Sequence, residues 1–267
     1  MQTRLGCLIM LRHSPLARAD IDGVALKPRE HDLERAAELP ADLLNVDYEG
    51  RDPFPATSSL SNLAVDRRVL ATTPVRADGF DPLGDDSLLP LPDGVGRVLV
   101  AGNPAYLTDD ERKRAVAPRF GAAREDAPDA WVGTEGVERV ALASGGPQYE
   151  LLSRTTVRDV RALRAAGYSG DIALYAPVVL SEDEDAVLDA VGAYAARRGP
   201  VKRALPDDPV VDGRASGRAR EVLSQAVRDY ALVGNVDDVA DRVGRLREAG
   251  VDTVVGYPAR GLDEFMA

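Results

Sequence analysis

Cysteine, histidine and lysine are scarce in this chain, and each scarcity argues against a class of chemistry. Cys7 is the only cysteine among 267 residues, so no disulfide can form within the chain, which is typical of a protein from a reducing cytoplasm. The only histidines are His13 and His31, which argues against a catalytic triad. There is neither a His-x-His pair nor a cluster of cysteines, so we predict no metal site.

Basic charge is scarce as well, and almost all of it is arginine. The chain has 33 Lys and Arg residues against 44 Asp and Glu, a formal net charge of -11, and its lysines are Lys27, Lys113 and Lys202. This balance argues against nucleic acid or an anionic membrane as a partner. An acidic composition poor in lysine is typical of the salt-adapted cytoplasm of a halophilic archaeon. A GC-rich genome is the alternative explanation.

Long hydrophobic runs are absent from the sequence. The apolar run before Arg12 and His13 is short and has no small-residue cleavage site, so it predicts a first strand rather than a signal peptide or a membrane helix. Hydrophobic residues nevertheless make up 45% of the chain, enough for a large core at this length. We predict one domain over residues 1–267.

Eight short apolar runs predict β-strands. Most are continuously apolar rather than alternating, which is typical of parallel strands covered on both faces. The predicted strands are Leu5–Leu11, Gly23–Lys27, Leu43–Asp47, Val69–Thr73, Val95–Ala101, Val137–Ala143, Ile172–Tyr175 and Thr253–Gly256. The predicted helices are His31–Leu39, Ser58–Val65, Asp109–Val116, Tyr149–Ala166, Glu182–Ala196 and Ala215–Tyr230.

This alternation of strands and helices predicts an α/β fold with right-handed crossovers. Eight strands favour a single closed (β/α)8 barrel of the TIM type over an open sheet. Two connections are poor crossovers, because residues 14–22 are few and residues 80–94 are rich in Pro, Gly and Asp. We therefore expect irregularity near strands 1–2 and 4–5, with a hairpin of the first two strands on an open sheet as the alternative.

The best-defined segment is the closing helix and strand, within residues 230–258. Asn235 is predicted to cap a helix that carries two aspartates in its first turn. Apolar residues follow at helical spacing until Gly250, which ends the helix. The β-branched run Thr253–Val255 then predicts a buried strand. Together they form the closing unit of a parallel α/β protein.

Few polar residues follow the predicted strands at the ends where a barrel builds its site. Asp47 and Glu49 come after the third predicted strand and are candidates for general acid–base chemistry, with solvated or salt-bridged carboxylates as the alternative. Lys27 is the one lysine placed for Schiff-base chemistry. Its alternative role is an ordinary ion pair.

A glycine-rich turn gives the second candidate site. Ser144, Gly145 and Gly146 are predicted to follow a strand and to open the helix that begins at Tyr149. Exposed backbone N–H groups at a helix N-terminus suit a phosphate group. An ordinary tight turn is the alternative.

Three segments resemble the bacterial luciferase-like monooxygenases, a superfamily that includes flavin- and deazaflavin-dependent oxidoreductases. The closing unit over residues 232–255, with Leu-Val-Gly-Asn-Val-Asp-Asp at its start, is similar to their C-terminal signature. Residues 51–75, beginning Arg-Asp-Pro-Phe-Pro, are similar to a helix after Asp-Pro and the following strand. The Ser-Gly-Gly-Pro turn over residues 144–147 is similar to a phosphate-binding turn.

The resemblance implies a (β/α)8 barrel that binds either FMN or the deazaflavin coenzyme F-420, hereafter F420. It implies catalytic roles near the cofactor ring for Asp47 and Glu49. The end of one strand would lie under the ring, and the glycine turn would hold phosphate. The cofactor-binding residues expected on this basis are Thr73, Pro74, Val75, Asn103, Ser144, Gly145 and Gly146.

The function expected from the resemblance is hydride transfer to or from a small organic substrate. The chain is shorter than most members and has Tyr48-Glu49-Gly50 where many have a Glu-His pair. A barrel without catalysis, binding a phosphorylated ligand or a protein, is therefore one alternative. A phosphate-handling lyase or aldolase that uses Lys27 is another. The expected partners are a small molecule and, as one option, a second copy of the chain.

Overall fold

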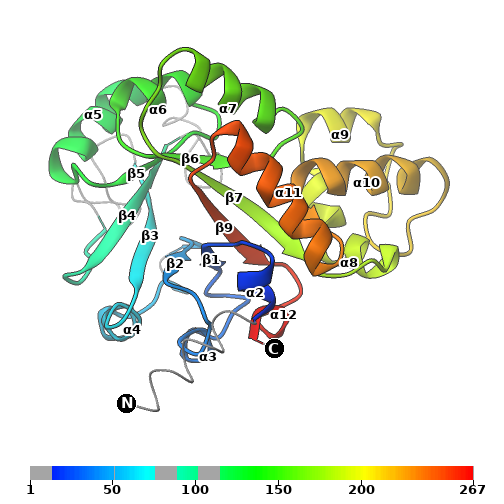
Figure 1. The fold of residues 1–267 in the computed structure, drawn as a ribbon, viewed down its shortest axis with the longest axis horizontal. Coiled ribbons are helices and arrows are strands. Elements are labelled where there is room, and N and C mark those ends of the chain that lie inside the picture. Colours follow the sequence, from blue (N-terminus) through cyan, green and yellow to red (C-terminus); the bar gives the residue numbers. More distant parts are fainter. Residues whose placement is uncertain (1–13, 51, 76–88, 102–114, 267) are drawn as a thin grey trace.

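Eight parallel strands close into a barrel with helices on its outside (Figure 1). The computed structural model describes residues 14–50, 52–75, 89–101 and 115–266. Each barrel strand pairs in parallel with its neighbours in the order β1-β2-β3-β4-β5-β6-β7-β9, and β9 pairs with β1 to close the ring. The barrel strands are β1 (Gly23–Leu26), β2 (Leu43–Val46), β3 (Arg68–Pro74), β4 (Val95–Val100), β5 (Trp131–Gly133), β6 (Gln148–Leu151), β7 (Ile172–Val179) and β9 (Thr253–Pro258).

The described helices vary in length, and none of them is both long and apolar enough to cross a lipid bilayer. They are α2 (Pro15–Arg18), α3 (Leu33–Ala36), α4 (Thr57–Leu63), α5 (Val116–Asp126), α6 (Glu138–Ser144), α7 (Thr156–Ala165), α8 (Glu184–Ala196), α9 (Gly199–Ala204), α10 (Gly217–Tyr230), α11 (Val236–Ala249) and α12 (Asp263–Met266).

Three of these helices, α8, α9 and α10, form a module between β7 and the two-residue strand β8 (Leu232–Val233). The module lies to one side of the barrel (Figure 1). It has a hydrophobic cluster of its own, in which Leu188 and Val191 of α8 pack with Leu223 and Val227 of α10. Strand β8 pairs with the end of β7, which attaches the module to the barrel wall.

The (β/α)8 barrel predicted from the sequence is confirmed, but two predicted elements are wrong. The predicted strand Val137–Ala143 lies mostly in helix α6, and the start of the predicted helix Tyr149–Ala166 belongs to strand β6. A short apolar run does not distinguish a buried strand from a buried helix. Here Gln148–Leu151 takes the place in the sheet, because its backbone pairs with both β5 and β7.

Two expectations about the first half of the chain have different outcomes. The predicted strand Leu5–Leu11 lies outside the described residues, and the eight strands that close the barrel all come from the described part. The poor crossover over residues 14–22 contains only the one-turn helix α2. Much of the other poor crossover, over residues 80–94, lies outside the described residues.

The closing helix and strand form as predicted, as α11 and β9. The side-chain oxygen of Asn235 accepts the N–H of Asp238 at 3.0 Å, and the carboxylate of Asp238 accepts the N–H of Asn235 at 3.2 Å. This reciprocal pair satisfies two backbone donors that a helix start leaves free. Gly250 ends the helix with φ of 114°, a conformation that favours glycine.

Aliphatic side chains and two further sets of residues, one on each half of the ring, face the inside of the barrel. We call Trp131, Tyr149, Tyr175 and Tyr257, which point inward from β5, β6, β7 and β9, the aromatic half-wall. We call Lys27, Asn45, Asp47 and Thr72, from β1, β2 and β3 or directly after them, the polar half-wall. Alternation along each strand produces both sets, since every second residue faces inward.

Candidate active site

Asp47 lies at the carboxyl end of β2, at the mouth of the barrel. Its Oδ1 accepts a hydrogen bond from Nδ2 of Asn45 at 2.9 Å and another from the Thr72 hydroxyl at 3.3 Å. The pairing of Val46 with Ala71 places Asp47 level with Thr72 on the next strand. Asn45 is fully buried, whereas Asp47 keeps part of its surface accessible to solvent.

The environment of Asp47 raises its pKa to about 7. Burial is the main cause, because protein atoms surround the carboxyl group and disfavour its charge. The Lys27 ammonium and the two hydrogen bonds act to lower the pKa, while the charge of Glu49 raises it. The result is a carboxyl group that can give or take a proton near neutral pH, as a general acid or base requires.

A second cluster, next to Asp47, joins the polar and aromatic half-walls. The Lys27 ammonium lies 3.1 Å from a Glu30 carboxylate oxygen and 4.0 Å above the centre of the Tyr257 ring. The Tyr257 hydroxyl donates a hydrogen bond to the other Glu30 oxygen. Burial acts to raise the pKa of Glu30, but the hydrogen bond from Tyr257 and the Lys27 charge outweigh it and lower that pKa.

Lys27 is thus held as one member of an ion pair. Its stem is half-buried, and a carboxylate and an aromatic face hold its ammonium group. Schiff-base chemistry needs a lysine that is free to attack a carbonyl group, whereas Glu30 and Tyr257 already engage this side chain. This geometry supports the ion-pair interpretation of Lys27 and gives the lyase alternative no support.

Glu49 and His31 lie at the rim of the same site. A Glu49 oxygen accepts the backbone N–H of Arg29 at 2.8 Å, which joins the segments after β1 and β2. His31 is buried, its Nδ1 accepts the backbone N–H of Lys27 at 3.0 Å, and burial lowers its pKa. The structure therefore gathers both predicted catalytic carboxylates, Asp47 and Glu49, around one opening.

The side chains at the end of β3, which we expected under a cofactor ring, do not all face the inside of the barrel. Pro74 comes two residues after the inward-facing Thr72 in β3 and therefore faces the same way. The Thr73 hydroxyl instead donates to the Ala71 carbonyl at 3.1 Å, and Val75 packs in a cluster outside the barrel. Of the three predicted residues, Pro74 therefore shares the face of Thr72, while Asn103 lies outside the described residues.

The glycine turn does not open a helix, so the reason for expecting phosphate there was wrong. Ser144 is the last residue of α6, and Gly145 and Gly146 lead into strand β6. The Ser144 hydroxyl donates to the Ala141 carbonyl at 2.7 Å. A turn that precedes a strand lies at the amino-end face of a barrel, opposite the mouth. The turn therefore lies apart from Asp47 and its partners.

Asn45, Thr72, Tyr175 and Tyr257 were missed as site residues. Each lies inside an apolar run, where a polar or aromatic residue resembles ordinary core. The signal that could find them is alternation, because Asn45 stands two residues before Asp47 and therefore faces the same way. Thr72 requires the register between β2 and β3 as well, which one strand alone does not give.

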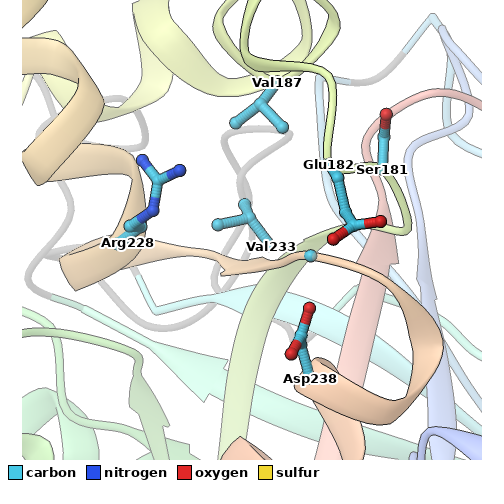
Figure 2. Close-up of a pocket in the computed structure, with 7 residues that line it drawn as sticks. Ser181, Glu182, Val187, Arg228, Val233 and Asp238 are labelled. Carbon is cyan, nitrogen blue, oxygen red and sulfur yellow. The ribbon is translucent and has the colours of Figure 1, made fainter.

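A separate cavity of about 320 Å³ lies between the barrel and the helical module. Figure 2 shows Glu182 and Asp238 on one side of it and Arg228 on the other, with Val187 and Val233 between them. Arg228 is ion-paired with Glu184 at 2.8 Å. The cavity is distinct from the Asp47 mouth, since none of the residues around Asp47 lines it.

The fold defines a class of protein, the (β/α)8 barrels, and two solved structures share it. The structure is similar to the coenzyme F420-dependent tetrahydromethanopterin reductase from Methanopyrus kandleri, with a TM-score of 0.60, 14% identity, and coverage of 91% of this chain and 94% of that one. It is also similar to an F420-dependent secondary alcohol dehydrogenase in complex with an F420-acetone adduct, with a TM-score of 0.54, 13% identity, and coverage of 90% and 94%.

The chain belongs to the family described as a family of unknown function, DUF7388, whose model matches residues 16–265. No curated protein sequence matches it. The resemblance drawn from the sequence is therefore confirmed for the fold. The halophilic, archaeal source expected from the composition stays a prediction.

Proposed function

We propose that this protein is a deazaflavin- or FMN-dependent oxidoreductase in which Asp47 exchanges a proton with a small organic substrate. The observation that carries the proposal is Asp47 itself, a largely enclosed carboxyl group at the barrel mouth whose pKa is raised to about 7. Perturbed carboxyl groups at the carboxyl ends of barrel strands are typical of active sites. The similar F420-dependent structures supply the cofactor class.

The residues at the mouth fit the ring of such a cofactor. Oδ1 of the fully buried Asn45 has no hydrogen-bond partner within the described part of the chain, so an N–H at the polar edge of a ring would satisfy it. The ring of Tyr257 supplies an aromatic wall nearby, beside Tyr175. Asn45, Thr72 and Pro74 are the residues we expect along the ring.

In the proposed reaction the bound cofactor would supply the hydride chemistry, and the protein would supply orientation and proton transfer. Asp47 would donate a proton to a carbonyl oxygen as that oxygen gains charge, or accept one from a hydroxyl in the reverse direction. The Lys27 ammonium would stabilise the ionised form of Asp47 after it gives up its proton.

Titration of the purified protein with F420 and with FMN tests the proposal. We expect one of them to raise the melting temperature, because a ligand that binds only the folded state stabilises it. Asp47→Asn should still bind the cofactor, but should lose about 100- to 10,000-fold in turnover across a panel of small alcohols and aldehydes.

Asp66→Asn is the matched control, because Asp66 is exposed and precedes the amino end of β3, opposite the mouth. It should behave like the unmodified protein in both assays. Absence of a thermal shift and of a bound-cofactor absorption with both FMN and F420 would exclude the proposed function.

A further inference from the structure

We infer that Asn45 and Thr72 are positioning residues that hold Oδ1 of Asp47 and leave Oδ2 as the oxygen that exchanges the proton. The inference rests on the proposed function only in assuming that Asp47 reacts with a substrate. The two hydrogen bonds to Oδ1 are present in the protein without ligand.

The two hydrogen bonds fall on the same oxygen. Nδ2 of Asn45 donates to Asp47 Oδ1 at 2.9 Å, and the Thr72 hydroxyl donates to it at 3.3 Å. No hydrogen bond joins Oδ2 to any of the described residues, and Asp47 keeps some surface open to solvent. The carboxyl group is therefore asymmetric, with two hydrogen bonds on Oδ1 and none on Oδ2 from the described residues.

This asymmetry decides where the proton resides. An oxygen that already accepts two hydrogen bonds is a poor position for a further hydrogen, whereas a protonated carboxyl group still accepts through its carbonyl oxygen. Asn45 and Thr72 can thus keep both bonds to Oδ1 in either protonation state. The proton of the neutral form lies on Oδ2, and the site need not rearrange when it leaves.

The charged and titratable groups around Asp47 come from four other parts of the barrel. Lys27 faces it from the end of β1 and Glu49 from the segment after β2, while Tyr175 of β7 and Tyr257 of β9 face it across the mouth. None of these donates a hydrogen bond to Oδ1. The orientation of the carboxyl group therefore depends on Asn45 and Thr72.

The test is a titration of Asp47 in the ligand-free protein, with carboxyl groups labelled by ¹³C and the Asp47 signal assigned by its loss in Asp47→Asn. Thr72→Val removes the hydroxyl with little change of shape. Because a hydrogen bond to the ionised form lowers the pKa, its removal should raise the Asp47 pKa by roughly half a unit to one unit. Thr72→Ser, which keeps a hydroxyl, should return the pKa toward its original value.

The same variants have a kinetic signature if the protein turns over a substrate. Thr72→Val should lower kcat more than it changes KM and should move the pH profile upward, while Thr72→Ser restores both. Equal titration curves for the unmodified protein, Thr72→Val and Thr72→Ser, with unchanged melting temperatures, would overturn the inference. Because the titration needs no cofactor, that outcome is distinct from a failure to bind FMN or F420.

Discussion

The two halves of the barrel wall present different side chains to the interior, aromatic rings on one half and hydrogen-bonded polar groups on the other. On the aromatic half-wall, Trp131 and Tyr149 have ring centres 5.6 Å apart, Tyr149 and Tyr175 6.2 Å, and Tyr175 and Tyr257 6.3 Å. On the polar half-wall, Asn45 and Thr72 bond to Asp47, next to the apolar side chains of Leu43 and Leu70. The aromatic half supplies cohesion, and the polar half holds Asp47, the group for which we propose proton exchange.

The two half-walls differ in the pKa values of the groups that they hold. Burial among protein atoms raises the Asp47 pKa, and the charge of Asp47 in turn acts to raise the pKa of Tyr175 and Tyr257. Burial also raises the pKa of Tyr175 well above its usual value, so this phenol stays protonated while Asp47 titrates. The titration range of Asp47 therefore lies well below that of Tyr175.

Removing one ring should produce the largest change in stability. Tyr175 is 8% exposed and contacts rings on both sides. Tyr175→Ala should lower the free energy of unfolding by about 3–5 kcal/mol, the usual cost of truncating a buried aromatic residue, as measured by urea denaturation. Tyr175→Phe keeps the ring and should lose much less. Equal losses in both variants would show that the hydroxyl group, and not the packing, is responsible.

Asp47, on the polar half-wall, should make the free energy of unfolding depend on pH. The Asp47 carboxyl group titrates near 3.8 when unfolded and near 7 when folded. Below pH 4 it is protonated in both states; between these values only the folded state holds the proton, so stability falls as the pH rises. The decrease from this one group reaches at most about 4 kcal/mol, at about 1.4 kcal/mol per pKa unit.

Asp47→Asn isolates this contribution, because it removes one carboxyl group and leaves every other titratable side chain in place. Unfolding by urea at pH 4, 5.5 and 8 should show the variant gaining relative stability as the pH rises, with the difference levelling off above pH 7. A constant difference across this range would mean that Asp47 is solvated like an ordinary surface carboxylate.

The features of the fold and the site that depend on a local sequence pattern could be predicted from the sequence. The cap at Asn235, the stop at Gly250 and the parallel barrel follow from spacing and apolar runs, and Asp47 follows from its place after a strand. The function assigned to the turn at Gly145 failed because it depended on which flanking segment was the strand. The partnership of Asp47 with Thr72 depends on strand register, which no short segment encodes.

The smallest effect is expected where the two half-walls meet, at Tyr257 and Glu30. Tyr257→Phe keeps the ring beneath the Lys27 ammonium but removes the hydroxyl that donates to Glu30. Glu30 keeps its bond to Lys27, so the loss should be that of one hydrogen bond, about 1 kcal/mol in the free energy of unfolding. Tyr257→Leu removes the ring as well and should cost more. If Tyr257→Phe costs as much as Tyr257→Leu, the contact between the half-walls depends on the hydroxyl, and the ring contributes little to holding Lys27 beside Asp47.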